Sequence, residues 1–229
     1  MRSGRNFLLA RRFQTWSMSA IATPVRFLTM PDTPPAPTTD DDNAVDVALM
    51  ERIGRGDEQA FRALVERHQN AVVGTIAKML RDPIEAEDLA QQVFLRIWKH
   101  AKRWRPEAKF TTYLFTIARN LVYNESRRRS RRKEISVDER QEDRGYEPAG
   151  DSRAEPDAEA ERSEMHEEID TVIASLPEAQ RTAVILYSYE SLAYEEIAEV
   201  LGTSVSSVKS LLFRARTTLR DKLSHLTGY

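Results

Sequence analysis

The feature that most constrains this fold is a pair of short amphipathic patterns near the C-terminus, over residues 191–216. Apolar residues at 197–201 form one helical face, and Gly202 follows them where a helix end favours a residue that tolerates positive φ. Ser204 then stands at the N-cap position of a second helix, whose apolar residues recur at i, i+3 and i+4 spacing. The pattern predicts a helix-turn-helix.

The second helix of this pair carries small and basic side chains on its front. Short serine side chains keep it slim enough to enter a major groove, and Lys209, Arg214 and Arg216 supply positive charge for phosphates and base edges. The motif therefore predicts DNA binding. The residues alone leave open an ordinary helical hairpin with a solvated basic face.

The rest of the chain shows helical periodicity and no strand pattern, so the predicted fold class is all-α. Asp57 stands at an N-cap position, and the Asp82-Pro83 pair separates two long helices because proline suits the first helical position. The helices predicted before the helix-turn-helix cover residues 46–53, 58–80, 83–101, 111–132, 169–176 and 177–187.

Charge divides the chain although the net charge is only −2. Residues 96–133 carry thirteen basic and two acidic side chains, whereas residues 134–168 carry fourteen acidic and four basic ones. The acidic stretch also has few apolar residues and contains Gly and Pro, which is typical of a disordered linker. We therefore predict two small helical domains, at residues 44–133 and 168–229, joined by a flexible acidic linker at residues 134–167.

Residues 1–43 are predicted to form a disordered N-terminal extension. The first thirty residues carry five arginines and no acidic side chain, and four prolines then precede a run of three aspartates. An organelle transit peptide has such a composition. The interpretation we favour is that this stretch lies upstream of the translated sequence, and that translation starts at Met18 or Met30.

Composition also excludes several classes of protein. The chain has no cysteine, which rules out disulfides and thiolate metal sites and favours a reducing cytoplasm. No apolar run approaches the length of a membrane span. The four histidines are scattered without metal-ligand spacing, and no phosphate-binding glycine loop occurs. The sequence therefore predicts no metal, no cofactor and no enzymatic activity.

Several motifs in order resemble extracytoplasmic-function (ECF) sigma factors, a subfamily of the sigma-70 superfamily. The resemblance lies at residues 57–61, 86–98 and 110–120, and then at residues 176–181 followed by the helix-turn-helix. It implies a dissociable subunit of bacterial RNA polymerase that selects promoters, melts the −10 element and starts transcription of a stress or envelope-signal regulon. The runner-up is a polymerase-independent helix-turn-helix transcriptional regulator, which leaves the N-terminal motifs unexplained.

The resemblance assigns two surfaces to the first domain. Core-polymerase binding, to the coiled coil of the largest subunit, is implied for Asp88, Gln91, Gln92 and Arg96. Recognition of the −10 element is implied for Arg105, Lys109, Arg119, Asn120, Tyr123, Asn124, Arg127 and Arg128. The chemistry fits independently, because melted DNA needs a basic groove with aromatic or amide groups for exposed bases. The alternatives are a solvated helix face and a nonspecific phosphate-binding run.

The resemblance assigns the −35 element to the helix-turn-helix. The implied DNA-binding residues are Ser204, Ser206, Ser207, Lys209, Ser210, Phe213, Arg214 and Arg216. Family members often have Arg or Lys at the position of Leu211, so this chain lacks one basic contact. The DNA sequence of its −35 element therefore does not follow from the family.

The resemblance also implies partners and a location. These are core RNA polymerase, through its coiled coil and flap, promoter DNA, and an anti-sigma factor, all in the cytoplasm without membrane insertion. The −10 and −35 elements lie about two duplex turns apart, roughly 70 Å. Repulsion between carboxylates favours an extended linker that spans this distance. A second hypothesis is that the acidic linker folds back on the basic −10 surface of the free protein.

Overall fold

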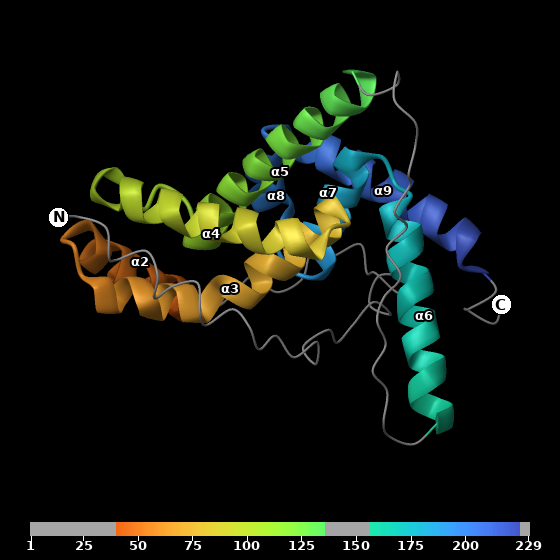
Figure 1. The fold of residues 1–229 in the computed structure, drawn as a ribbon, viewed down its shortest axis with the longest axis horizontal. Helices are drawn as coiled ribbons and strands as arrows, with labels where there is room; N and C mark the ends of the chain where they lie inside the picture. Colours follow the sequence, from red (N-terminus) through yellow and green to blue (C-terminus); the bar gives the residue numbers. More distant parts are fainter. Residues whose placement is uncertain (1–39, 136–155, 225–229) are drawn as a thin grey trace.

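The computed structural model describes residues 40–135 and 156–224. These residues form helices and connecting turns, with no strand among them, so the prediction of an all-α fold is confirmed (Figure 1). The N-terminal domain contains α2 (Asp40–Gly54), α3 (Glu58–Leu80), α4 (Pro83–His100), the short 3₁₀ helix η2 (Ala101–Arg103) and α5 (Phe110–Ile135). The C-terminal domain contains α6 (Pro156–Ala174), α7 (Glu178–Ser188), α8 (Tyr194–Leu201) and α9 (Val205–Lys222).

Local signals set most helix boundaries. The Asp57 carboxylate accepts hydrogen bonds from the amides of Gln59 and Ala60 at the start of α3, and Asp82 accepts one from Glu85 at the start of α4. Each bond satisfies an amide that has no partner within its helix. Between these caps the chain reverses at Arg81, which adopts a left-handed conformation.

Two boundaries differ from those predicted from the sequence. Helix α2 begins at Asp40, inside the segment predicted to be a disordered extension, and α6 begins at Pro156, inside the predicted linker. Acidic residues favour a helix N-terminus, which suits the aspartates that open α2, and alanine and glutamate are strong helix formers, which suits the start of α6. The remaining calls on the extension and the linker, at residues 1–39 and 136–155, lie outside the described residues.

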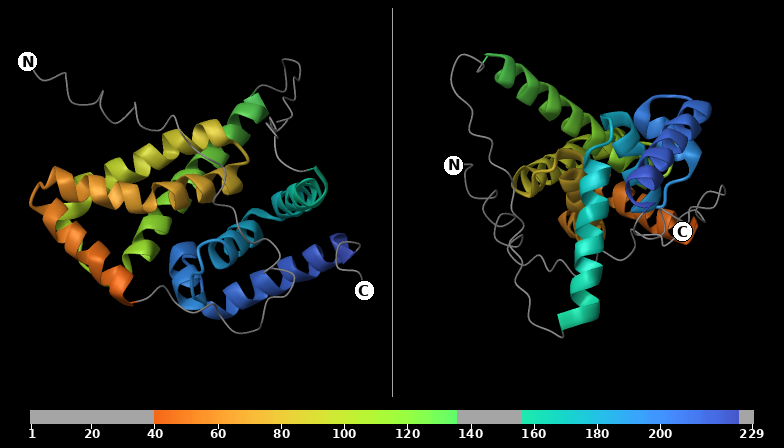
Figure 2. Two further views of the ribbon diagram at one scale, coloured as in Figure 1. Left: turned by 90° about the horizontal axis from the view of Figure 1, so that it is seen from below. Right: turned by 90° about the vertical axis from the view of Figure 1, so that its right-hand side faces the viewer.

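The N-terminal domain packs around α3. Helix α3 lies beside α4 and α2, and α5 crosses α3 and α4 (Figures 1 and 2). A buried carboxylate adds a polar tie to the apolar core: Asp46 of α2 pairs with Arg67 at 3.0 Å and with the His68 ring at 2.9 Å, both on α3. The amide of Phe110 donates to the side chain of Asn43, so α2 also holds the first turn of α5.

The C-terminal domain is a small bundle in which α7 packs against α9 and α8. Its core consists of buried aliphatic and aromatic side chains, including Ile169, Ile185, Leu186, Ile197 and Leu219. Arg181 donates to the backbone carbonyls of Ala174 and Leu176, which closes the turn between α6 and α7. The helix-turn-helix is therefore one part of a cooperatively packed domain.

The two domains contact each other directly. Helix α8 lies on α5, while α7 and the C-terminal part of α6 lie on α3; the N-terminal part of α6 projects away (Figures 1 and 2). Thr75 of α3, which is only 1% exposed, donates a hydrogen bond to the Glu190 carboxyl just after α7. Burial raises the pKa of Glu190 from 4.5 to about 7, although the bond from Thr75 acts in the opposite direction.

The Glu190 carboxyl predicts a pH-dependent stability. Its pKa is higher in the folded chain than in the unfolded chain, so the folded chain binds the proton more tightly. Its contribution to stability is therefore full below pH 4.5 and is lost as the pH rises through about 7. We expect Glu190→Gln, which stays neutral, to remove a slope of at most about 1.4 kcal/mol per pH unit.

The measurement is urea unfolding followed by circular dichroism between pH 5 and 8.5. Glu199→Gln, an exposed change on α8, serves as the control and should keep the slope of the parent chain. Identical pH profiles for Glu190→Gln and the parent chain would contradict the prediction.

Candidate polymerase and nucleic-acid interface

The predicted core-polymerase residues lie together on the outward face of α4. Asp88, Gln92 and Arg96 are exposed at successive turns of the helix, and Gln91 is half-buried beside them. The opposite face packs into the domain through Leu89, Ala90, Val93, Phe94 and Ile97. The core therefore does not require the polar stripe, which is available for a partner.

Two apolar residues on this stripe were missed from the sequence. Ile84 is 82% exposed and Leu95 is 45% exposed, and both fall on the outward side of α4 with Asp88 and Gln92. Exposed aliphatic side chains at the centre of a polar patch are typical of a protein-binding surface. The signal was present in the sequence, because both residues lie off the apolar stripe that packs into the core.

On α5, three of the predicted −10 residues form a stacked ladder. The Arg119 guanidinium lies 5.3 Å from the centre of the Tyr123 ring, and the Arg127 guanidinium lies 5.7 Å from it. Asn120 and Asn124 are exposed next to this ladder, and Arg119 donates to the Asn120 amide oxygen. The ladder combines cations for a phosphate backbone with an aromatic face and amides for unstacked bases.

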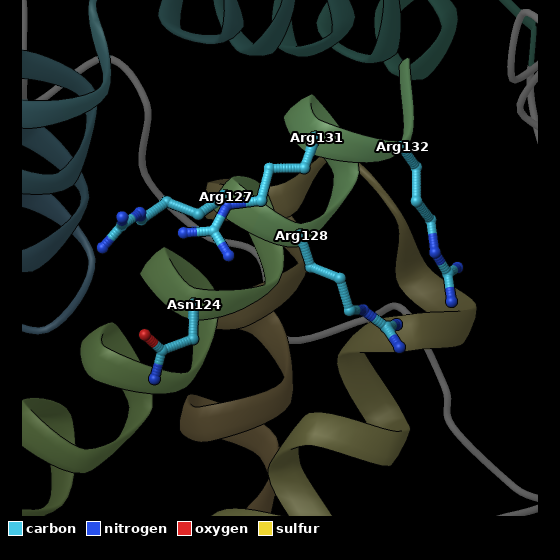
Figure 3. Close-up of a pocket in the computed structure, with 5 residues that line it drawn as sticks. All are labelled: Asn124, Arg127, Arg128, Arg131 and Arg132. Carbon is cyan, nitrogen blue, oxygen red and sulfur yellow. The ribbon is translucent and has the colours of Figure 1, made fainter. Parts of the chain in front are cut away.

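A pocket beside this ladder is lined by arginines. Its lining residues are Asn124, Arg127, Arg128, Arg131 and Arg132 (Figure 3). Arg127 and Arg131 extend to one side of α5, whereas Arg128 and Arg132 extend to the other. Guanidinium groups and an amide around one hollow suit a phosphate or a base edge, since each arginine offers a planar fork of donors.

Arg128 differs from Arg127 in its surroundings. It pairs with Glu125 at 2.7 Å and with Glu85 of α4 at 3.3 Å. Its neighbour Arg129 pairs with Asp82, Glu85 and Glu125. These ion pairs tie the C-terminal half of α5 to the first turn of α4, so the assigned DNA role of Arg128 competes with a structural one.

Two further −10 residues lie at the start of α5. Arg105, in the exposed loop before the helix, donates to the backbone carbonyl of Trp104. Lys109 pairs with Glu196 of α8 at 3.0 Å, so the C-terminal domain occupies this cation. Trp104 packs against Phe110 and Tyr113, which places the tryptophan with the aromatic edge of the core.

The predicted helix-turn-helix is confirmed as α8 and α9. Gly202 has a φ of 64° at the end of α8, and the Ser204 hydroxyl accepts a hydrogen bond from the amide of Ser207 at the start of α9. Ser206, Lys209, Ser210, Phe213 and Arg214 are exposed, and Phe213 is 68% exposed. Ser207 and Arg216 are half-buried, so they face the domain more than the solvent.

The exposed stripe of α9 extends beyond the predicted residues. Thr217 and Arg220 are exposed on the turns that follow Phe213. Thr217 uses its hydroxyl to donate to the backbone carbonyl of Phe213, whereas no hydrogen bond occupies the Arg220 side chain in the described part of the chain. Helical periodicity continued past Arg216 would have identified both residues.

Comparison with known proteins agrees with these two domains. A family model described as sigma-70 region 2 matches residues 64–132, and one described as sigma-70 region 4 matches residues 166–219. The RNA polymerase sigma-H factor of Pseudomonas aeruginosa is 35% identical over 185 residues, which cover 79% of this chain and 95% of the relative. The ECF RNA polymerase sigma-E factor of Haemophilus influenzae is 33% identical over 184 residues, covering 79% of this chain and 96% of the relative.

The chain belongs to the ECF family of sigma factors. A sigma factor binds RNA polymerase and directs it to promoters, and this is the function of the chain. The solved structure of the sigma factor RpoE in complex with the anti-sigma factor NepR, from Bartonella quintana, has the same fold, with a TM-score of 0.58 at 24% identity over 72% of this chain and 96% of that one.

Within the described residues of this sigma factor, no group of three or more acidic or histidine side chains is arranged to hold a metal ion. None of its described helices is long and apolar enough to cross a membrane.

The surroundings of Arg127 and Arg128 predict different effects of substitution. Arg127→Ala should weaken the binding of a single-stranded DNA oligonucleotide and reduce the salt slope of log K by about 0.7, the value of one lost phosphate contact. Arg128→Ala should change the slope less and should destabilise the chain by about 1–2 kcal/mol, because Glu125 loses a partner.

Fluorescence anisotropy over a series of KCl concentrations measures the slope, and urea unfolding measures stability. Arg62→Ala, an exposed change on α3, removes the same charge from a surface with no assigned DNA contact. If Arg128→Ala reduced the slope as much as Arg127→Ala and left unfolding unchanged, Arg128 would be a DNA contact.

Proposed function

We propose that three exposed helix faces of this sigma factor bind three different partners. The outward face of α4 binds the coiled coil of core polymerase, α5 binds the melted −10 element, and α9 reads the −35 element. The observation that carries this proposal is the separation of the faces, because each lies opposite the buried side of its own helix. Each face can therefore bind its partner without disturbing the core of its own domain.

The α4 face has the composition of a protein-binding surface. Asp88, Gln92 and Arg96 supply polar groups with fixed spacing, and the exposed Leu95 supplies an apolar anchor between them. An aliphatic side chain surrounded by polar groups is the usual arrangement of an interface centre and its rim. This face supports polymerase binding rather than DNA binding.

The α5 and α9 faces have the composition of nucleic-acid surfaces. The Arg119–Tyr123–Arg127 ladder offers stacking and charge, which suits a single strand. The α9 face offers small serines, Lys209 and Phe213, which suits the edge of a duplex in its major groove. We therefore assign melting to α5 and duplex reading to α9.

A polymerase-independent transcriptional regulator is not favoured, because the family membership extends to the first domain and not only to the helix-turn-helix. We further propose that this sigma factor acts in the cytoplasm on stress or envelope-signal genes and has no catalytic activity of its own. The solved RpoE relative is bound to the anti-sigma factor NepR, and a comparable anti-sigma partner is proposed here.

The proposal predicts a loss of polymerase binding when the α4 face is altered. Asp88→Ala combined with Gln92→Ala should weaken binding to sigma-free bacterial core polymerase at least tenfold, which is about 1.4 kcal/mol. Leu95→Ala should have an effect of similar size, because it removes the apolar anchor. The measurements are a core-binding titration and run-off transcription from a promoter pool that includes the region upstream of this gene.

Glu51→Ala, an exposed change on α2, is the matched control and should bind core polymerase normally. Transcripts that appear only with the parent chain and vanish with the Asp88/Gln92 variant establish the α4 face. Tight, salt-sensitive DNA binding without any transcript would instead support a regulator that works without polymerase.

A further inference from the structure

We propose that α2 holds both ends of the loop before α5, residues 104–109, and that Asn43 of α2 positions this loop for the melted −10 element. The inference rests on the proposed assignment of the −10 element to α5, together with Arg105 and Lys109 of this loop, which is called the −10 loop below. Helix α2 lies outside residues 64–132, which the family model of sigma-70 region 2 matches. Contacts at the two ends of the loop carry the proposal.

The −10 loop has little packing of its own. Arg105, Pro106 and Glu107 are exposed, and a backbone hydrogen bond joins the amide of Glu107 to the carbonyl of Arg105 at 2.9 Å. A short exposed loop keeps a single conformation at the cost of backbone entropy, so its neighbours must hold its ends. The described contacts of both ends lead to α2.

Asn43 holds the end of the −10 loop. Its side-chain oxygen accepts a hydrogen bond at 2.9 Å from the amide of Phe110, the first residue of α5. The first amides of a helix have no partner within it, and the side chain of the N-cap residue usually accepts one of them. Lys109 precedes α5, and its ammonium offers donors but no acceptor. Asn43 therefore supplies, from a neighbouring helix, the bond that the local sequence lacks.

Helix α2 is itself fixed to α3. Asp46, one turn after Asn43, is buried, pairs with Arg67 at 3.0 Å and lies 2.9 Å from the His68 ring nitrogen. The centre of the His68 ring lies 5.2 Å from that of the Phe110 ring. Phe110 thus contacts α2 directly through its amide, and its ring contacts a histidine that α2 holds.

The start of the −10 loop lies against the other end of α2. Gly54 is the last residue of α2, and a Cβ atom at this position would lie 3.2 Å from the carbonyl oxygen of Ala101. Glycine therefore permits the close approach of α2 to η2. The amide of Trp104, the first residue of the loop, donates to the carbonyls of His100 and Ala101. One helix thus holds both ends of the loop.

Aromatic side chains join the two ends of the loop. The centre of the Trp104 ring lies 6.5 Å from that of Phe110 and 6.2 Å from that of Tyr113. A loop that is ordered before DNA arrives loses less conformational entropy when it binds. Asn43 acts through Phe110 and the loop and contacts no surface assigned to DNA or polymerase. Its substitution should therefore impair promoter opening and leave polymerase binding intact.

Asn43→Leu tests this role, because leucine has a similar size and no acceptor. With sigma-free bacterial core polymerase, the full-length variant should form open complexes about fivefold more slowly than the parent chain, the effect of one lost hydrogen bond. Permanganate reactivity of unpaired thymines measures opening, on promoters selected from the run-off pool. Asn43→Asp keeps an acceptor oxygen at the start of α5 and should open promoters at the parent rate. Both variants should bind core polymerase as the parent chain does.

Two further variants separate positioning from stability. Val73→Ala truncates a buried side chain of α3 and should lower the urea midpoint at least as much as Asn43→Leu, yet it should open promoters at the parent rate. If Asn43→Leu fails to fold by circular dichroism, Gly54→Ala tests the other end of the loop. Alanine favours a helix more than glycine does, so stability should not fall, whereas its Cβ atom should displace η2 and slow opening.

Opening by Asn43→Leu at the parent rate would overturn the role of α2, and so would an equal loss in Asn43→Asp or in Val73→Ala. Tyr123→Ala, on the exposed face of α5, keeps this inference distinct from the proposed function. Normal opening by Tyr123→Ala would reject the assignment of the −10 element to α5. A loss in Tyr123→Ala without a loss in Asn43→Leu would reject the role of α2 alone.

Discussion

The structure depends most on the position of α5, because this helix serves both the core and the surface. Phe110, Leu114, Phe115, Ala118 and Leu121 are buried and hold the N-terminal domain together, while Tyr123, Asn124 and Arg127 are exposed on its C-terminal half. A shift of α5 that repacks the core would also move the side chains that we propose to bind DNA. The ion pairs of Glu125 with Arg128 and Arg129 therefore matter beyond stability, since they fix the half of α5 that lies beyond the apolar core.

Neighbouring arginines of α5 make different kinds of contact. Arg127 stacks on Tyr123 and points to solvent, whereas Arg128 and Arg129 meet the acidic first turn of α4. The carboxylates at Asp82 and Glu85 serve two purposes, because they favour the N-terminus of α4 and also bind the guanidinium groups. Nearby carboxylates thus neutralise part of the charge of this basic run, and the remaining arginines are the ones that we propose to contact DNA.

The parts of the fold that depend on neighbouring residues were predictable from the sequence. The caps at Asp57 and Ser204, the helix break at Asp82-Pro83 and the turn at Gly202 are local, and the structure confirms them. Partners far apart in the chain were not predictable, because periodicity does not say which surfaces meet. Arg128 and Glu85 are such a pair, and so are Lys78 and Asp170 across the two domains. The helical starts of α2 and α6 were missed because acid-rich composition favours disorder on average, although the same acids favour a helix N-terminus.

The contact between the two domains is partly polar. Its described bonds link Thr75, Lys78 and Lys109 to carboxylates of the C-terminal domain, and each of these groups finds water or another partner when the domains part. Apolar side chains of both domains also belong to one buried cluster, which includes Leu64 and Phe110 of the first domain and Leu186 and Ile197 of the second. The contact between the domains therefore combines these polar bonds with apolar packing.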